Sequence, residues 1–222
     1  KKAKQREEFG QAMAGIVTGM IGALPGGDRI NAAIKRELNP IVLAPAKAGP
    51  NKQYEHYEKM LAARGYTLDP KTPTVVALRG ISTATGKHDT TAAPTYDDAI
   101  VVLNKDEKGK ITVTTLAGST HPGQSTEGVG GTVGVPDVNG GGKPDVGMID
   151  PGECRLVPHG DHAGAKAWDV HTVEGSGQIP GVGDTNQDGK YSQSEKDDSQ
   201  SRKDVLTGVM IHQGGKTEPW SA

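Results

Sequence analysis

The sequence predicts a mixed α+β fold, in which a helical N-terminal segment precedes a β-rich domain. Apolar residues recur at helical spacing within residues 1–71, whereas residues 72–222 contain short runs rich in Val, Ile and Thr. Glycine supplies 32 of the 222 residues, and aromatic residues make up only 4%. This composition is typical of short strands joined by long Gly-rich loops, and it argues against an all-helical bundle.

The N-terminal segment is expected to contain three helices. In the first, apolar side chains recur at steps of three and four residues until Pro25 ends the pattern. A second helix is expected to begin at a cap on Asp28 and to stop before Asn39, and a third runs from about Asn51 to Gly65. The apolar stripe of the first helix consists of Phe9, Met13, Ile16, Val17, Met20, Ile21 and Leu24.

The β-rich domain is expected to begin at residue 72. Strands are predicted where β-branched residues cluster or alternate, and the polar turn at residues 104–109 is typical of a hairpin. The Gly-rich stretch 117–147 is predicted to form loops. The predicted strands are 74–78, 99–103, 111–116, 154–157, 167–170 and 205–211.

Charge and cysteine content exclude several classes of function. The chain has 25 basic and 27 acidic residues, and a net charge of −2 gives no strong attraction to nucleic acid or to an acidic membrane. The single cysteine, Cys154, excludes an intrachain disulfide and a Cys-based zinc knuckle. No apolar run reaches the length of about 18 residues that a membrane span requires, so none is expected.

The sharpest motif is the run DTNQDGKYSQSE at residues 184–195, which fits the twelve-residue calcium-loop pattern. Calcium takes six to eight oxygen ligands, which this pattern supplies from fixed positions. The stretch 175–183 is too rich in glycine for the preceding helix of an EF-hand, so we expect one structural Ca²⁺ loop inside another fold. The predicted ligands are Asp184, Asn186, Asp188, the carbonyl of Lys190 and Glu195, with Ser192 acting through water.

A second stretch, residues 137–145, begins with the same Asp-x-Asn pattern as the calcium loop. Gly141 stands where the pattern requires a carboxylate or carboxamide at its fifth position. We therefore expect this stretch to bind metal weakly or not at all. For the loop at 184–195, the alternative interpretation is an acidic, solvated turn.

His212 is the leading candidate for a catalytic residue. It follows an apolar strand candidate and precedes Gly214 and Gly215. A strand end holds a side chain rigidly, and glycines let a substrate approach the backbone. The alternative is a partly buried structural histidine.

Other histidines suggest a second kind of site. His159 and His162, together with His171 and His121, could bind zinc, because three imidazoles leave a coordination position open for an activated water. The simpler interpretation is that these are polar residues beside a substrate groove.

From residue 75 to its end, the chain resembles the L,D-transpeptidase-like catalytic domains, most closely the branch found in phage and secreted bacterial proteins. The run IHQGG at 211–215, followed by PWSA at 219–222, is similar to that family's IH-x-G strand end and its S-x-G-C segment. Shorter similar runs precede these in the same order, at residues 76–80, 96–100, 118–123, 149–153 and 159–162.

The resemblance implies cysteine-dependent acyl transfer on peptidoglycan stem peptides. In the family, a Cys is the nucleophile and the His of the strand end activates it. His212 takes that place here, and the Cys is expected two residues beyond Ala222, so the 222 residues alone are expected to be inactive. The groove residues suggested by the resemblance are Arg79, His121, His159, His162, Gly214 and Gly215.

The resemblance also implies a periplasmic or extracellular location, with a possible secretion or immunity partner. Two other functional classes stay open. One is a non-catalytic binding module stabilised by Ca²⁺. The other is a zinc-dependent peptidoglycan amidase built on the histidines.

Overall fold

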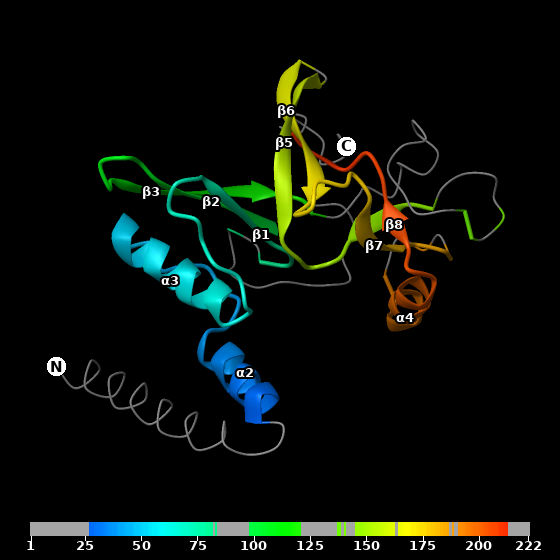
Figure 1. Ribbon diagram of the computed structural model, residues 1–222, viewed down its shortest axis with the longest axis horizontal. Coiled ribbons are helices and arrows are strands. Elements are labelled where there is room, and N and C mark those ends of the chain that lie inside the picture. The colour runs from blue at the N-terminus through cyan, green and yellow to red at the C-terminus, as the bar shows by residue number, and fades with distance from the viewer. Residues whose placement is uncertain are drawn as a thin grey trace. The chain divides into compact units, whose positions relative to one another are not determined.

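The computed structural model describes residues 27–81, 83, 98–120, 137–138, 140, 145–162, 164–186, 188 and 191–212 (Figure 1). Within these ranges the chain forms three helices and three sheets of three strands each. The predicted mixed α+β class is therefore confirmed. The first predicted helix, which ends before Pro25, lies outside the described residues.

Helices α2 (Gly27–Leu38) and α3 (Pro50–Ala62) occupy the positions of the second and third predicted helices. Pro50 stands in the first turn of α3, where a missing backbone N–H leaves no helical hydrogen bond unmade. The connector between the two helices is anchored by Tyr57, whose hydroxyl accepts a hydrogen bond from the Ala44 N–H at 3.1 Å. None of the described helices is both long enough and apolar enough to cross a lipid bilayer.

The first sheet has the order β1-β2-β3 and confirms three predicted strands. Its members are β1 (Thr74–Leu78), β2 (Asp98–Lys105) and β3 (Ile111–Gly118). The turn after β2 is fixed by Asp106, whose carboxylate accepts the N–H groups of Lys108 and Lys110 at 2.9 and 2.8 Å. Gly109 adopts a φ of +80°, a conformation that glycine reaches without strain.

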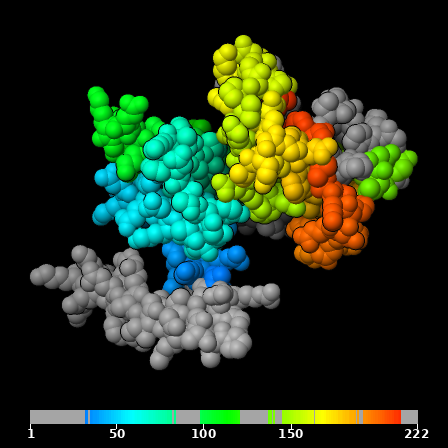
Figure 2. Space-filling view, in the orientation of Figure 1, coloured from blue at the N-terminus to red at the C-terminus, as the bar shows by residue number. Residues whose placement is uncertain are grey.

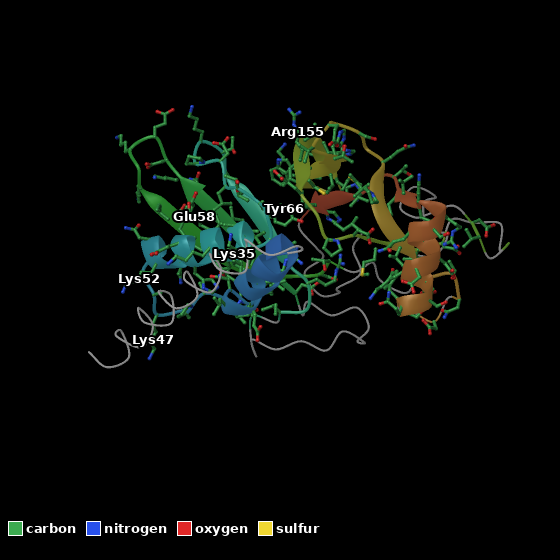
Figure 3. All side chains as sticks on the ribbon, turned by 60° about the horizontal axis from the view of Figure 1, so that its bottom comes forward. Lys35, Lys47, Lys52, Glu58, Tyr66 and Arg155 are labelled. Atoms are coloured by element: carbon green, nitrogen blue, oxygen red, sulfur yellow. The ribbon has the colours of Figure 1, made fainter. Side chains whose placement is uncertain are left out.

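The chain divides into two compact units. The first contains the described residues up to 76 together with 101–114, and the second contains 77–100 and 115–212. This division differs from the predicted boundary after residue 71, because the outer parts of β2 and β3 belong to the same unit as the helices. Both views place α3 alongside these strands (Figures 1 and 3).

The second unit contains a small antiparallel sheet with the order β4-β7-β8. Its strands are β4 (Gly147–Ile149), β7 (Ile179–Gly183) and β8 (Val205–Leu206). Gly181 on the central strand allows the close approach of its neighbours, because a Cβ there would overlap the Leu206 side chain and lie 2.6 Å from the Met148 carbonyl oxygen. Helix α4 (Gln193–Arg202) contacts β7.

The same unit contains a second antiparallel sheet, with the order β5-β6-β9. Strands β5 (Cys154–His162) and β6 (Ala165–Thr172) form a long hairpin that projects from the unit, and β9 (Met210–His212) pairs with β6 (Figures 1 and 2). The prediction of one strand over 205–211 is wrong, because β8 and β9 lie in different sheets. Gly208 adopts a φ of +71° between them, which an extended strand does not accommodate.

Asp98 is fully buried, and three donors among the described residues bind to it. Its Oδ1 accepts the Gly80 N–H at 2.5 Å, and its Oδ2 accepts the N–H and hydroxyl of Thr120 at 2.5 and 2.6 Å. The Arg79 guanidinium donates to Thr120 Oγ1 and to the Ile149 carbonyl, each at 3.0 Å. This network joins the ends of β1, β2, β3 and β4, so it fixes the chain segments that meet there.

Replacing Asp98 by Ala should lower the free energy of unfolding by about 3 kcal/mol, because three buried donors lose their acceptor and the Arg79 guanidinium loses a nearby negative charge. Urea unfolding followed by circular dichroism measures this loss. Asp106→Ala is the matched control, since it removes a carboxylate that also accepts backbone N–H groups but lies in an exposed turn. A loss for Asp98→Ala no larger than that for Asp106→Ala would contradict the assignment.

Candidate functional site

The β5-β6-β9 sheet brings His212 next to His162, although fifty positions separate them in the sequence. His212 pairs with Ala167 of β6, and His162 pairs with Ala165. Residues two apart on a strand share a face, so both histidines lie on the same face of the sheet. Their ring centroids are 4.9 Å apart, with an angle of 54° between the ring planes. Arg155 marks the position of β5 in Figure 3, with the red strand β9 in the same sheet.

His159 joins this pair through an irregularity in β5. The register shifts between Pro158 and Gly160, which leaves His159 outside the regular pairing. Its Nδ1 lies 3.0 Å from Asp169 Oδ1, and its ring centroid lies 6.3 Å from that of His162. We call His159, His162, Asp169 and His212 the histidine face.

The histidine face is accessible to solvent and holds one imidazole in a defined orientation. The side chains of His159 and Asp169 are 39% and 32% exposed. A hydrogen bond from the His159 Nδ1–H to the carboxylate leaves the Nε2 atom able to accept a proton or bind a cation. The face can therefore exchange protons or supply imidazole ligands.

Arg79, a predicted groove residue, is engaged in the Asp98 network. Its guanidinium donates to Thr120 and Ile149, and burial lowers its pKa, while the charge of Asp98 opposes that shift. Arg79 thus has a structural role in the second unit. His121, Gly214 and Gly215 lie outside the described residues.

The other two residues weighed as site members lie elsewhere on the hairpin. His171 Nδ1 is 3.0 Å from the Gly175 carbonyl oxygen, so this ring is held by the turn that follows β6. Cys154 lines a cavity of about 230 Å³ at the start of β5. Gly160 and His212 both pair with Ala167, so they lie at the same height in the sheet. Six strand residues, about 20 Å, separate Gly160 from Cys154, so Cys154 lies far from His212.

A strand precedes the predicted calcium loop, and a helix follows it. β7 ends at Gly183, so no helix precedes the loop, as its glycine-rich approach predicts. Helix α4 begins at Gln193, after a cap at Ser192. The Asp188 N–H donates to Asp184 Oδ1 at 3.1 Å and to Asn186 Oδ1 at 2.9 Å. Three of the predicted oxygen ligands therefore belong to one tight turn, whereas Lys190 lies outside the described residues.

Glu195 closes this loop and caps α4 at the same time. Its Oε1 accepts the Thr185 N–H at 2.9 Å and the Asn186 N–H at 3.3 Å, and its Oε2 accepts the N–H and hydroxyl of Ser192 at 2.8 Å each. Ser192 Oγ in turn accepts the Glu195 N–H, which completes a capping box. The oxygen-rich donor set suits a calcium-sized cation, but Glu195 must exchange these hydrogen bonds to ligate it with both oxygens.

Tyr191 is close enough to the predicted calcium loop and to Arg79 to be affected by the charges of both. Burial raises the pKa of its phenol, and the nearby charge of Asp184 raises it further, whereas Arg79 lowers it.

In the second stretch, residues 137–145, two carboxylates accept backbone N–H groups of the same stretch. Asp137 Oδ1 accepts the Gly140 N–H at 2.8 Å, and the buried Asp145 accepts the Val138 N–H at 3.1 Å. Among the described residues, no group of three or more His, Cys, Asp or Glu side chains is placed so that it could hold a metal ion. Metal binding by either stretch stays a prediction.

No protein-family model, no curated protein and no solved structure matches this chain. The function of the chain must therefore be inferred from the resemblance in sequence and from the geometry of the two sites.

Adding Ca²⁺ should raise the melting temperature, because an ion that binds only the native state stabilises it by about 2.7 kcal/mol at one hundred times its dissociation constant. Asp184→Asn keeps the size of the side chain and a hydrogen-bond acceptor but removes a charged ligand, so it should abolish the increase. Differential scanning calorimetry with and without EDTA measures both. Asp137→Asn is the control and should respond to Ca²⁺ like the parent chain. An unchanged melting temperature in millimolar Ca²⁺ would refute the site.

The pH dependence of stability should report on Glu195. Burial raises the pKa of its carboxyl, but hydrogen bonds from Ser192, Asn186 and Thr185 lower it by more, so the pKa in the folded state lies below its ordinary value of 4.5. The unfolded state then binds more protons, so this stabilisation is present above pH 4.5 and is lost as the pH falls through the folded-state pKa.

In EDTA, the stability difference between the parent chain and Glu195→Gln should therefore be largest near neutral pH and shrink toward pH 3. Urea unfolding at a series of pH values gives this difference. Glu107→Gln in the exposed turn after β2 is the control, and it should show little difference at any pH. A Glu195→Gln difference that does not vary with pH would show that the carboxylate charge is not involved.

Proposed function

We propose that this chain belongs to a cysteine-dependent acyl-transfer domain of the L,D-transpeptidase-like type, which acts on peptidoglycan stem peptides. The observation that carries the proposal is the position of His212. It ends β9 on the solvent-accessible histidine face, 4.9 Å from the ring of His162, and the family-like Gly-rich run follows it. An imidazole at a strand end is rigid enough to serve a nucleophile on the next segment.

In the proposed reaction, the His212 imidazole takes the proton of a cysteine thiol. The thiolate attacks the carbonyl of a stem peptide, and the imidazolium then protonates the leaving amine. Backbone N–H groups beside the cysteine would stabilise the oxyanion. The proposed reaction requires this cysteine, which the family pattern places two residues beyond Ala222.

His159 and His162 are proposed to line the substrate side of this site, because both share its face of the sheet. Arg79 is not assigned to the substrate, since Thr120 and Ile149 engage its guanidinium. Ca²⁺ in the loop 184–195 is proposed as a structural ion that fixes the junction between β7 and α4. A cell-wall substrate and a calcium site suit a periplasmic or extracellular protein with a secretion or immunity partner.

The alternative is a binding module stabilised by Ca²⁺ and without catalysis. The hydrogen bonds that close the loop around Glu195 are consistent with it, because such a loop stabilises any fold that contains it. A zinc amidase that joins His171 to His162 is less favoured, since His171 pairs with Arg155 and His162 pairs with Ala165, and six strand residues, about 20 Å, separate these pairs.

The test uses the longer chain that includes the segment after Ala222. His212→Gln should reduce cleavage or exchange of stem peptides in purified cell-wall fragments by at least about 100-fold, the usual contribution of a general base. His56→Gln on α3 is the control and should keep full activity. The proposal fails if the longer chain has no cysteine at the expected position, or if His212→Gln retains activity.

A further inference from the structure

The histidine face contains three imidazoles and a carboxylate, whereas acyl transfer requires only one imidazole as a base. We propose that His159, His162 and His212 bind one divalent transition-metal ion of the zinc type, with Asp169 as the carboxylate behind one of the ligands. The site is separate from the oxygen-rich loop at 184–195, and its ligands come from two strands and a bulge of one sheet.

The donor set selects the class of metal. Imidazole nitrogen suits Zn²⁺, Co²⁺, Ni²⁺ and Cu²⁺, whereas Ca²⁺ and Mg²⁺ take oxygen ligands. Three imidazoles also leave a fourth tetrahedral position for water or a substrate group. The two sites of this chain should therefore select different metals.

The ring separations suit this set of ligands. With metal–nitrogen bonds of about 2.0 Å in a tetrahedral arrangement, imidazole centroids lie about 5 Å apart. His162 and His212 are already at 4.9 Å, whereas His159 lies 6.3 Å from His162. His159 would therefore have to approach His162 to complete such a site, since no metal-holding trio is assembled among the described side chains. Its side chain is 39% exposed, so its ring is not locked by packing.

Asp169 supplies the second, independent argument. Metal-binding histidines usually donate their other ring N–H to a carboxylate, which fixes the tautomer and strengthens the ligand. The contact of 3.0 Å between His159 Nδ1 and Asp169 Oδ1 has this form, and it leaves Nε2 for the metal. An exposed His–Asp ion pair alone contributes little to stability and does not require two further imidazoles beside it.

Metal binding at this site would also regulate the proposed reaction. A metal on His212 occupies the nitrogen that the proton transfer requires, so zinc should inhibit reversibly. This consequence rests on the proposed function, whereas binding itself does not. A spectroscopic measurement of binding therefore separates the failure of one proposal from the failure of the other.

The probe is Co²⁺, added to tag-free, EDTA-treated chain in the presence of excess Ca²⁺, which keeps the loop 184–195 saturated. One equivalent should produce the intense visible bands of tetrahedral Co²⁺, and Zn²⁺ should displace it. His162→Gln and His159→Gln should weaken binding at least tenfold. Asp169→Asn should weaken it by about 10- to 100-fold, as loss of a carboxylate behind a ligand usually does.

Two matched variants keep the test specific. His171→Gln removes a histidine of the same strand, and Asp161→Asn removes a carboxylate of the same hairpin that pairs with Lys166. Both should bind Co²⁺ like the parent chain, and circular dichroism checks that every variant is folded. The proposal is overturned if no saturable tetrahedral spectrum forms, or if His162→Gln leaves it unchanged. It is also overturned if His171→Gln weakens binding as much as His159→Gln.

Discussion

The register of β9 on β6 is the constraint on which the candidate site depends. Three residue pairs define it, Ala167 with His212, Trp168 with Ile211, and Asp169 with Met210, and the Val170 N–H extends the pairing by donating to the Val209 carbonyl at 2.9 Å. A slip of one residue would turn His212 onto the face of Trp168 and away from His162 and Asp169. The proposed acid–base chemistry and the proposed metal binding both require the observed register.

Two buried carboxylates hold the surrounding loops by the same physical means. Asp98 and Glu195 each accept several N–H groups from separate chain segments, so each replaces backbone pairing where the strands end. The two carboxylates differ in their surroundings. Asp98 lies near the permanent charge of Arg79, whereas Glu195 would exchange its hydrogen bonds for the proposed Ca²⁺, so the loop at 184–195 is the part that the proposed ion would change.

Local sequence signals predicted much of this structure. The position of α3, the hairpin of β2 and β3 and the absence of a helix before Asp184 all follow from nearby residues. The prediction failed where a single residue interrupts a pattern. Gly208 divides an apolar run into strands of two different sheets.

The grouping of the histidines could be predicted only in part. His159 and His162 are neighbours in sequence, but their approach to His212 depends on strand pairing across about fifty residues, for which one sequence contains no local signal. Asp169 could have been found, because it alternates with Ala167 and His171 along a predicted strand. The structural role of Arg79 could not, since its partners Thr120 and Ile149 lie on distant segments.

The most direct test of the central claim is a nuclear Overhauser measurement on the isotopically labelled chain, with the ring protons of His162 and His212 assigned by single substitutions. The account predicts cross-peaks between these two imidazoles. A His212 ring that shows cross-peaks to the Trp168 indole and none to His162 would place it on the opposite face of the sheet. Both the proposed base and the proposed metal site would then be wrong.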